Sequence, residues 1–179
     1  MNRPNQSEYA PYYEGYVSQV SENDILPVLR SQLDALDVLL NNVPADRETY
    51  RYAEGKWSIR EIVGHLIDAE RVFGYRALCI ARGEKQGLPG FDQNEYMLTA
   101  PYDRISVEDL LSELRLVRLS NIAMMRTLDE EAWSRAGTAN NNEITVRALA
   151  FIMAGHVRHH MNVLRERYLT SATSQPANA

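Results

Sequence analysis

A single cysteine, Cys79, occurs among the 179 residues, which excludes an internal disulfide and fits a reducing compartment. No apolar run approaches the roughly 20 residues that a membrane-spanning helix requires, and the polar start 1–7 lacks the apolar core of a signal peptide. Basic residues are too few to attract nucleic acid or an anionic membrane, because 19 lysines and arginines face 24 acidic residues. We therefore expect a soluble, cytoplasmic protein whose partners include neither nucleic acid nor membrane.

The chain also lacks the sustained alternation of polar and apolar residues that is typical of a half-buried strand. Apolar residues instead recur at helical spacing in four stretches, within 25–43, 58–83, 106–128 and 145–167. Four helices with one apolar face each bury those faces together by packing as a bundle. We predict an all-α fold, a four-helix bundle that forms one domain.

Three of these stretches begin with a residue that can cap a helix. Ser58 can accept a hydrogen bond from the first turn while Glu61 reaches back to it, which is the pattern of a capping box. Ser106 offers a similar cap, and Thr145 follows a polar turn at 140–143. These signals predict helix starts immediately after Ser58, Ser106 and Thr145.

The remaining segments differ in composition. Residues 84–104 contain two glycines and two prolines and should form an extended connection between the second and third helices, of a length that is often functional. We expect 21–170 to form the bundle, 171–179 to be a disordered tail, and 1–20 to lie across the bundle as a clasp. This arm is rich in tyrosine, with Tyr9, Tyr12, Tyr13 and Tyr16.

Three of the four histidines lie on apolar helix faces. His156 and His160 are four residues apart, so their imidazoles are offset by about 40° and about 6 Å along a helix and can reach one point. His65 lies on a different predicted helix, and a buried imidazole needs a partner. A shared divalent cation would be one, and separate hydrogen bonds to core carbonyls or hydroxyls would be another. His159 points about 100° away from His160 and is given no metal role.

A glycine precedes the histidine at two of these positions, as Gly64-His65 and Gly155-His156. Glycine inside a helix costs roughly 0.5 to 1 kcal/mol relative to alanine, so each position needs a reason. Room beside the imidazoles is one reason, and close helix packing is the alternative.

Three neutral imidazoles suit zinc or nickel and leave coordination positions for water or substrate, whereas closed structural sites usually have four protein ligands. The motif His-Glu-x-x-His of zinc peptidases has a glutamate after the first histidine, where this chain has Val157. The sequence therefore argues against a peptidase mechanism. Asp68 and Glu70 are candidates for supporting His65, although exposed helix carboxylates are the favoured reading.

Other polar residues could complete a site. Arg76 projects from nearly the same helix face as His65, about 16 Å along the axis, and could meet the anionic end of a substrate. A salt bridge that closes the bundle is the favoured alternative. Cys79 is about 21 Å from His65 along one helix, too far to bind the same ion. Four residues of the long connection could line the mouth of the site or serve only to fold the loop: Asp92, Gln93, Asn94 and Tyr96.

The run 57–70, the loop 91–96 and the ending 154–160 together resemble the DinB-like metalloprotein family over roughly residues 20–170. This four-helix-bundle superfamily includes mycothiol-, bacillithiol- and related thiol-dependent transferases. The resemblance implies an antiparallel bundle with at least one long crossover, and a homodimer. It also implies that His65, His156 and His160 bind one divalent ion, commonly nickel or zinc, between the second and fourth helices.

The leading functional prediction is an enzyme whose metal activates a low-molecular-weight thiol for transfer to an electrophile. Activation of water by a hydrolase ranks second, because hydrolysis would ordinarily use a carboxylate to handle the proton. The alternative from another class is a non-enzymatic metal-binding, ligand-binding or stress-response module. An open coordination position beneath 84–104 would favour catalysis, and a sealed shell would favour a structural role.

Overall fold

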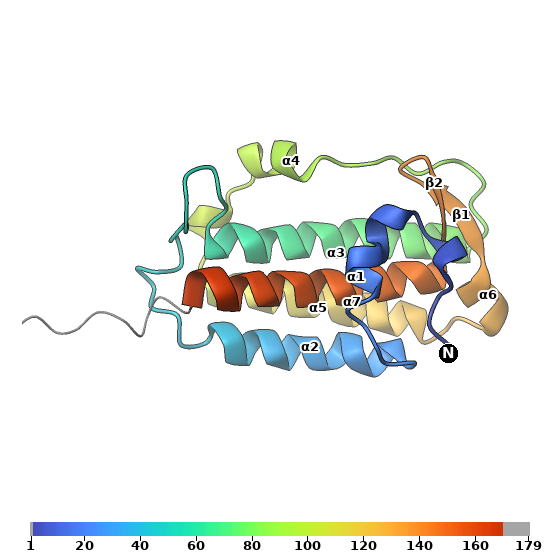
Figure 1. Cartoon of the computed structure of the whole chain (residues 1–179), viewed down its shortest axis with the longest axis horizontal. Coiled ribbons are helices and arrows are strands. Elements are labelled where there is room, and N and C mark those ends of the chain that lie inside the picture. The colour runs from blue at the N-terminus through green and yellow to red at the C-terminus, as the bar shows by residue number, and fades with distance from the viewer. Residues whose placement is uncertain (1, 170–179) are drawn as a thin grey trace, which may run out of the picture.

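A computed structural model describes residues 2–169, in which four long helices lie alongside one another (Figure 1). They are α2 (Ile25–Leu40), α3 (Ile59–Ala81), α5 (Val107–Met125) and α7 (Val146–Val163). The predicted four-helix bundle is confirmed. None of the helices in the described part of the chain is long and apolar enough to cross a membrane. The tail predicted for 171–179 lies outside the described residues.

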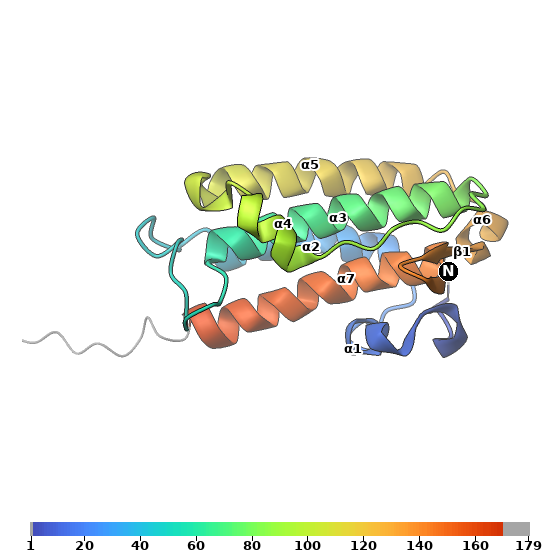
Figure 2. The ribbon, with the colours of Figure 1, turned by 90° about the horizontal axis from the view of Figure 1, so that it is seen from above.

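The connection between α3 and α5 returns along the length of the bundle, as Figures 1 and 2 show. As a result α3 and α5 run in the same direction, whereas α7 runs antiparallel to α3, against which it packs. The predicted long crossover is therefore confirmed. It carries two short helices, α4 (Gln93–Thr99) and η3 (Tyr102–Arg104). The other short elements are η1 (Gln6–Glu8), η2 (Pro11–Tyr13), α1 (Glu14–Val17), α6 (Glu130–Ser134), β1 (Ala136–Ala139), β2 (Asn142–Thr145) and the π-helix η4 (Leu164–Leu169).

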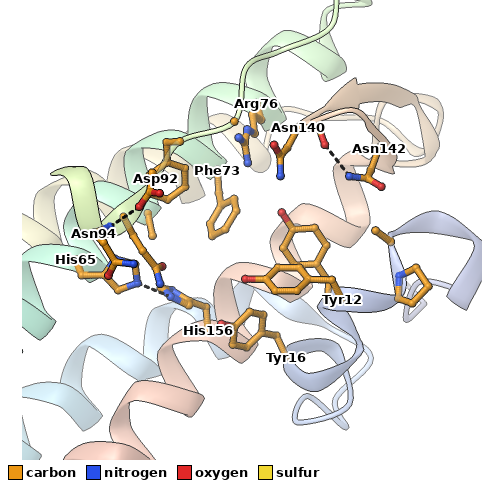
Figure 3. A pocket seen from close by; sticks show the side chains of 17 residues that line it. Tyr12, Tyr16, His65, Phe73, Arg76, Asp92, Asn94, Asn140, Asn142 and His156 are labelled. Atoms are coloured by element: carbon orange, nitrogen blue, oxygen red, sulfur yellow. Dashed lines mark hydrogen bonds between the residues drawn. The ribbon is translucent and has the colours of Figure 1, made fainter. Parts of the chain in front are cut away.

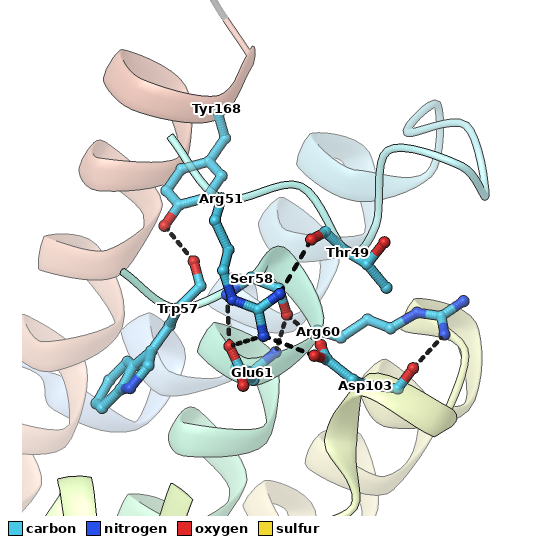
Figure 4. A network of polar contacts seen from close by, with 8 residues as sticks. All are labelled: Thr49, Arg51, Trp57, Ser58, Arg60, Glu61, Asp103 and Tyr168. Atoms are coloured by element: carbon cyan, nitrogen blue, oxygen red, sulfur yellow. Dashed lines mark hydrogen bonds and ion pairs between the residues drawn. The ribbon is translucent and has the colours of Figure 1, made fainter. Parts of the chain in front are cut away.

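The helix starts lie where the capping residues predict them. The Ser58 hydroxyl accepts from the Glu61 amide at 3.1 Å, and the Glu61 carboxylate accepts from the Ser58 amide at 2.7 Å. The same end of α3 is tied to the neighbouring segments by Arg51, which pairs with Glu61 at 2.8 Å and Asp103 at 2.6 Å (Figure 4). The Ser106 and Thr145 hydroxyls cap α5 and α7 by accepting from the Asp109 and Ala148 amides at 3.1 Å, without the reciprocal bond.

A two-stranded antiparallel hairpin, β1–β2, precedes α7 where the sequence predicted only a polar turn. Its two-residue loop is Asn140-Asn141, and both residues have positive φ, of 50° and 60°. Such a loop is typical of a tight hairpin turn, and asparagine tolerates this conformation better than most residues. Strands of four residues are too short to produce a visible alternation of polar and apolar side chains. Leu88 of the crossover pairs with Ala139 and ties the connection to the hairpin.

A buried polar network joins the four long helices. Arg118 of α5 donates to the Glu70 carboxylate of α3 at 2.8 Å, and to the Leu29 carbonyl and Gln32 side chain of α2 at 3.2 and 3.1 Å. Gln32 in turn donates to the Ala154 carbonyl of α7 at 2.7 Å. Burying an ion pair is favourable only when further hydrogen bonds support both charges. Here α2 supplies two acceptors to Arg118 and a side-chain amide of α5 donates to Glu70 at 2.9 Å, while the Arg118 Nη2 has no hydrogen-bond partner among the described residues.

This network corrects two predictions. Helical spacing of the apolar residues in 106–128 predicts that Val117 and Asn121 lie on the buried face of this helix, whereas in α5 Arg118 and Ile122 are buried and the predicted pair is half-buried. Glu70 was expected at the surface and is only 3% exposed. A pattern of apolar residues could not reveal either change, because an arginine and a glutamate become core residues only as a pair.

Replacing Glu70 with glutamine should lower the free energy of unfolding by about 3 to 5 kcal/mol, because Arg118 would keep a buried charge without a counter-charge. Replacing Arg71 with methionine, which removes its half-exposed ion pair with Glu113, should cost less than about 1 kcal/mol. Urea unfolding followed by circular dichroism measures both. Equal effects of the two substitutions would contradict the assigned role of the network.

Candidate metal centre

The structure brings together the three histidines that the sequence singled out. His65 of α3 and His156 of α7 have their Nε2 atoms 2.9 Å apart, and the Nε2 atoms of His156 and His160 are 3.1 Å apart. All three side chains are buried, with exposed fractions of 2, 5 and 9%. Among the described residues, this is the only cluster of three or more potential ligand side chains close enough to share one ion.

The donor set fits a divalent cation better than it fits hydrogen bonding. A neutral imidazole has one donor and one acceptor nitrogen, so the Nε2 of His156 cannot be satisfied by two other Nε2 atoms at once. Two nitrogens bound to one ion at about 2.1 Å lie about 3.0 Å apart at a right angle and about 3.4 Å apart at the tetrahedral angle. The separations of 2.9 and 3.1 Å therefore suit adjacent positions around one ion.

Burial keeps the three imidazoles uncharged. Loss of solvation is the main cause that lowers the pKa of His65 to about 4, and the nearby His159 adds to it. The pKa values of His156 and His160 also lie well below the usual range, again chiefly through burial and then through the neighbouring histidines. Neutral imidazoles are the form that binds metal, so no proton has to be removed near neutral pH.

Close packing, and not space for the imidazoles, explains both glycines. A Cβ on Gly64 would lie 2.2 Å from the Tyr102 ring, and a Cβ on Gly155 would lie 2.1 Å from the backbone oxygen of Tyr16. The N-terminal arm therefore packs directly on α7 beside His156. The Tyr16 ring lies edge-on to the His156 imidazole, with ring centroids 5.4 Å apart. Of the two explanations offered by the sequence, the second is correct.

The histidine cluster opens into a pocket of about 850 Å³ (Figure 3). His65 and His156 lie at one end of it, and Arg76 and Asn140 lie at the other. The crossover supplies one wall with residues 90–94, and the N-terminal arm supplies another. The lining side chains that the sequence did not associate with the site are Tyr12, Tyr13, Tyr16, Phe73, Phe91, Asn140 and Asn142.

Three of the four residues predicted to line the mouth of the site do line the pocket. Asp92 caps α4 by accepting hydrogen bonds from the Asn94 and Glu95 amides, and it lines the pocket with Gln93 and Asn94. Tyr96 instead packs against Phe91 with ring centroids 5.4 Å apart. Asp92 is thus the one carboxylate among the lining residues, and it is already engaged at a helix start.

The two carboxylates considered as supports for His65 bind other groups. The Asp68 carboxylate accepts a hydrogen bond from the Tyr102 hydroxyl at 2.7 Å, and Glu70 belongs to the buried network. His159 is half-buried and packs against the Tyr16 ring at 5.6 Å, outside the cluster, as its spacing predicted. Cys79 is half-buried and free, and it borders a separate hollow near 82–86.

Arg76 is buried but does not close the bundle with a salt bridge, so that favoured reading is wrong. Its Nη2 donates to the Pro89 carbonyl at 2.7 Å, and no carboxylate of the described chain pairs with it. The guanidinium instead lines the pocket that contains the histidines. Sequence patterns cannot separate these outcomes, because both place a cation at the same helix position.

Comparison with known proteins identifies one curated relative and several solved structures that resemble this chain. A curated protein of Oceanobacillus iheyensis named "Putative metal-dependent hydrolase" is 24% identical over 137 residues, which cover 76% of this chain and 79% of the relative. Among solved structures, YfiT of Bacillus subtilis, described as a probable metal-dependent hydrolase with an unusual four-helix bundle topology, superimposes with a TM-score of 0.74. That match has 17% identity and covers 96% of this chain and 94% of YfiT.

A mycothiol-dependent maleylpyruvate isomerase matches with a TM-score of 0.65 and 15% identity, over 82% of this chain and 61% of the isomerase. At these identities the solved structures support the fold alone. The model of the DinB superfamily matches residues 29–164, which include all three clustered histidines and most of the bundle. The chain therefore belongs to the DinB superfamily.

Proposed function

We propose that His65, His156 and His160 hold one divalent metal ion, zinc or nickel, in an enzyme that acts on a small molecule. The observation that carries this proposal is the convergence of three buried, neutral imidazoles at one end of a large pocket. Three protein ligands leave coordination positions for an exogenous molecule. The names of the curated relative and of YfiT support metal dependence.

A low-molecular-weight thiol is the molecule we propose for the open side of the site. A bound divalent cation lowers the pKa of a coordinated thiol or water and so supplies a nucleophile near neutral pH. The pocket lining offers no unengaged carboxylate as a general base, and the pKa of Tyr16 is raised to about 12, chiefly by burial. A thiol can ionise without such a base. The thiol dependence named for the isomerase supports the same choice.

Hydrolysis is the second candidate, because two relatives are named as metal-dependent hydrolases. In that case water would occupy the position of the thiol, and its proton would have to leave through solvent. A non-enzymatic binding module is less well supported, because His65 and His156 line an open pocket and residues 2–169 supply no fourth histidine, cysteine or carboxylate to the cluster. A cytoplasmic homodimer remains our proposal for the working form of the protein.

Replacing His156 with alanine should reduce bound metal from one ion per chain to nearly none, because it removes the imidazole that lies between the other two. His159→Ala is the matched control, since it removes a neighbouring histidine outside the cluster. Metal analysis of both proteins after dialysis against nickel or zinc, with circular dichroism to verify folding, measures the difference. Full occupancy in folded His156→Ala would refute the assignment.

The metal-free protein should lose stability as the pH falls from about 6.5 towards 4. The folded-state pKa of His65 is about 4, below the usual 6.5, so the unfolded chain binds more protons in this window. Replacing His65 with glutamine should reduce the slope of the unfolding free energy by up to about 1.4 kcal/mol per pH unit. Urea unfolding at several pH values, with a chelator present, measures the slope. An unchanged slope would show that His65 ionises normally.

Metal-loaded protein should conjugate cellular thiols to an electrophile such as monochlorobimane, in a reaction that requires both metal and thiol. His160→Ala should reduce the rate to the uncatalysed background, and His159→Ala should retain most of it. Fluorescence of the conjugate measures the rate, and p-nitrophenyl acetate tests hydrolysis in parallel. Background rates across all thiols and metals would contradict the transferase proposal, and metal-dependent ester cleavage in their place would favour the hydrolase.

A further inference from the structure

Two arginines of the described chain are buried, and they differ in their partners. Arg118 is 1% exposed and pairs with Glu70 at 2.8 Å. Arg76 is 3% exposed, and no carboxylate among residues 2–169 lies within ion-pair distance of it. A charge removed from water is costly unless an opposite charge and hydrogen bonds compensate it. Arg76 therefore lacks a counter-charge that the fold provides for Arg118.

The guanidinium of Arg76 is nevertheless held in a defined position. Its Nη2 donates to the Pro89 carbonyl at 2.7 Å, and its Cζ lies 5.9 Å from the Phe73 ring and 6.0 Å from the Phe91 ring. Aromatic faces attract a cation but do not neutralise it. The carbonyl uses only one of the five N–H groups of an arginine. The Tyr13 hydroxyl accepts from the guanidinium as well, and the N–H groups that remain can donate to a ligand in the pocket.

Arg76 is the one arginine or lysine among the residues that line this pocket. The single lining carboxylate, Asp92, is exposed and caps α4. The Tyr13 hydroxyl adjoins the guanidinium, and burial raises its pKa, so it remains neutral. Asn140 lines the same end of the pocket, and its side-chain oxygen lies against Gly90, next to the Pro89 carbonyl that Arg76 binds. A carboxylate could pair with the fork of an arginine in this environment through two parallel hydrogen bonds.

We propose that Arg76 binds a carboxylate at the end of the substrate that is remote from the reacting atom. The inference rests on the proposed function for the reactive end, which would lie at His65 and His156. Arg76 follows His65 by eleven residues on α3, and the Phe73 ring lies 5.9 Å from the Arg76 Cζ and 6.1 Å from the His156 ring, so the two ends of the ligand are several bonds apart. The pocket thus selects small molecules with a reactive head and an anionic tail. Arg76 acts as a residue for positioning and specificity.

Binding of an anion to Arg76 can be tested without metal or thiol. In ¹³C,¹⁵N-labelled, metal-free protein, the Arg76 Nε–Hε signal, assigned through its correlation with the Arg76 backbone signals, should shift saturably on titration with hexanoate. Hexanamide, of equal length and without charge, should bind at least about fivefold more weakly. This comparison uses the unaltered chain, so it holds even if Arg76→Met fails to fold. Equal shifts with both probes, or shifts confined to surface arginines such as Arg71, would overturn the proposal.

The metal-loaded enzyme provides the second test, with monochlorobimane as the electrophile. 6-Mercaptohexanoate should have a KM about 10- to 100-fold lower than that of 6-mercaptohexanol, because a charge-assisted hydrogen bond to Arg76 is made by the acid alone. Arg76→Met should raise the KM of the acid to that of the alcohol and leave kcat unchanged, while Arg71→Met should alter neither. Equal KM values in the unaltered enzyme would contradict a carboxylate site.

The outcomes of the two tests distinguish a failure of the proposed thiol chemistry from a failure of the proposed anion site. If no thiol is conjugated but hexanoate still binds at Arg76, the proposed thiol chemistry is wrong and the anion site stands. If conjugation occurs without preference for the acid, and hexanoate does not bind, the thiol chemistry stands and the anion site is wrong.

Discussion

The buried ion pair between Glu70 and Arg118 is the interaction on which the arrangement of the bundle depends. Through Gln32 it reaches the backbone of Ala154, so one network fixes the relative positions of α2, α3, α5 and α7. Glu70 follows His65 by five residues on α3, and Ala154 precedes His156 by two on α7. Apolar faces alone allow helices to slide past one another, whereas a buried charge is satisfied in one register only. The network therefore determines where the imidazoles of the two helices meet.

The cost of burying a charge also explains the different chemistry at the two ends of the pocket. At one end, burial holds the three imidazoles neutral, so they offer lone pairs to a cation. At the other end, Arg76 keeps its charge in a pocket whose one lining carboxylate is engaged at the start of α4. The fold supplies Arg118 with a counter-charge and leaves Arg76 without one. An anionic group on the substrate would supply the counter-charge that Arg76 lacks.

Sequence reasoning predicted features that depend on local geometry. Ser58, Ser106 and Thr145 cap helices because a hydroxyl binds the amides of the next turn in any fold, and the spacing of His156 and His160 places both rings on one side of a helix. Features that need a distant partner were missed or left undecided. The core role of Arg118 depends on Glu70, and the reason for Gly155 is the backbone of Tyr16, 139 residues earlier. The hairpin at Asn140-Asn141 was missed because its strands are too short for their periodicity to be recognised.

X-ray absorption spectroscopy of the nickel-loaded protein tests the central claim most directly, because it reports the atoms bound to the metal. The account predicts three imidazole nitrogens at about 2.0 to 2.1 Å, together with oxygen ligands from water. Addition of 6-mercaptohexanoate should then introduce one sulfur ligand while the three imidazoles remain. A spectrum without imidazole scattering, or one identical with that of the His156→Ala protein, would contradict a metal centre built from His65, His156 and His160.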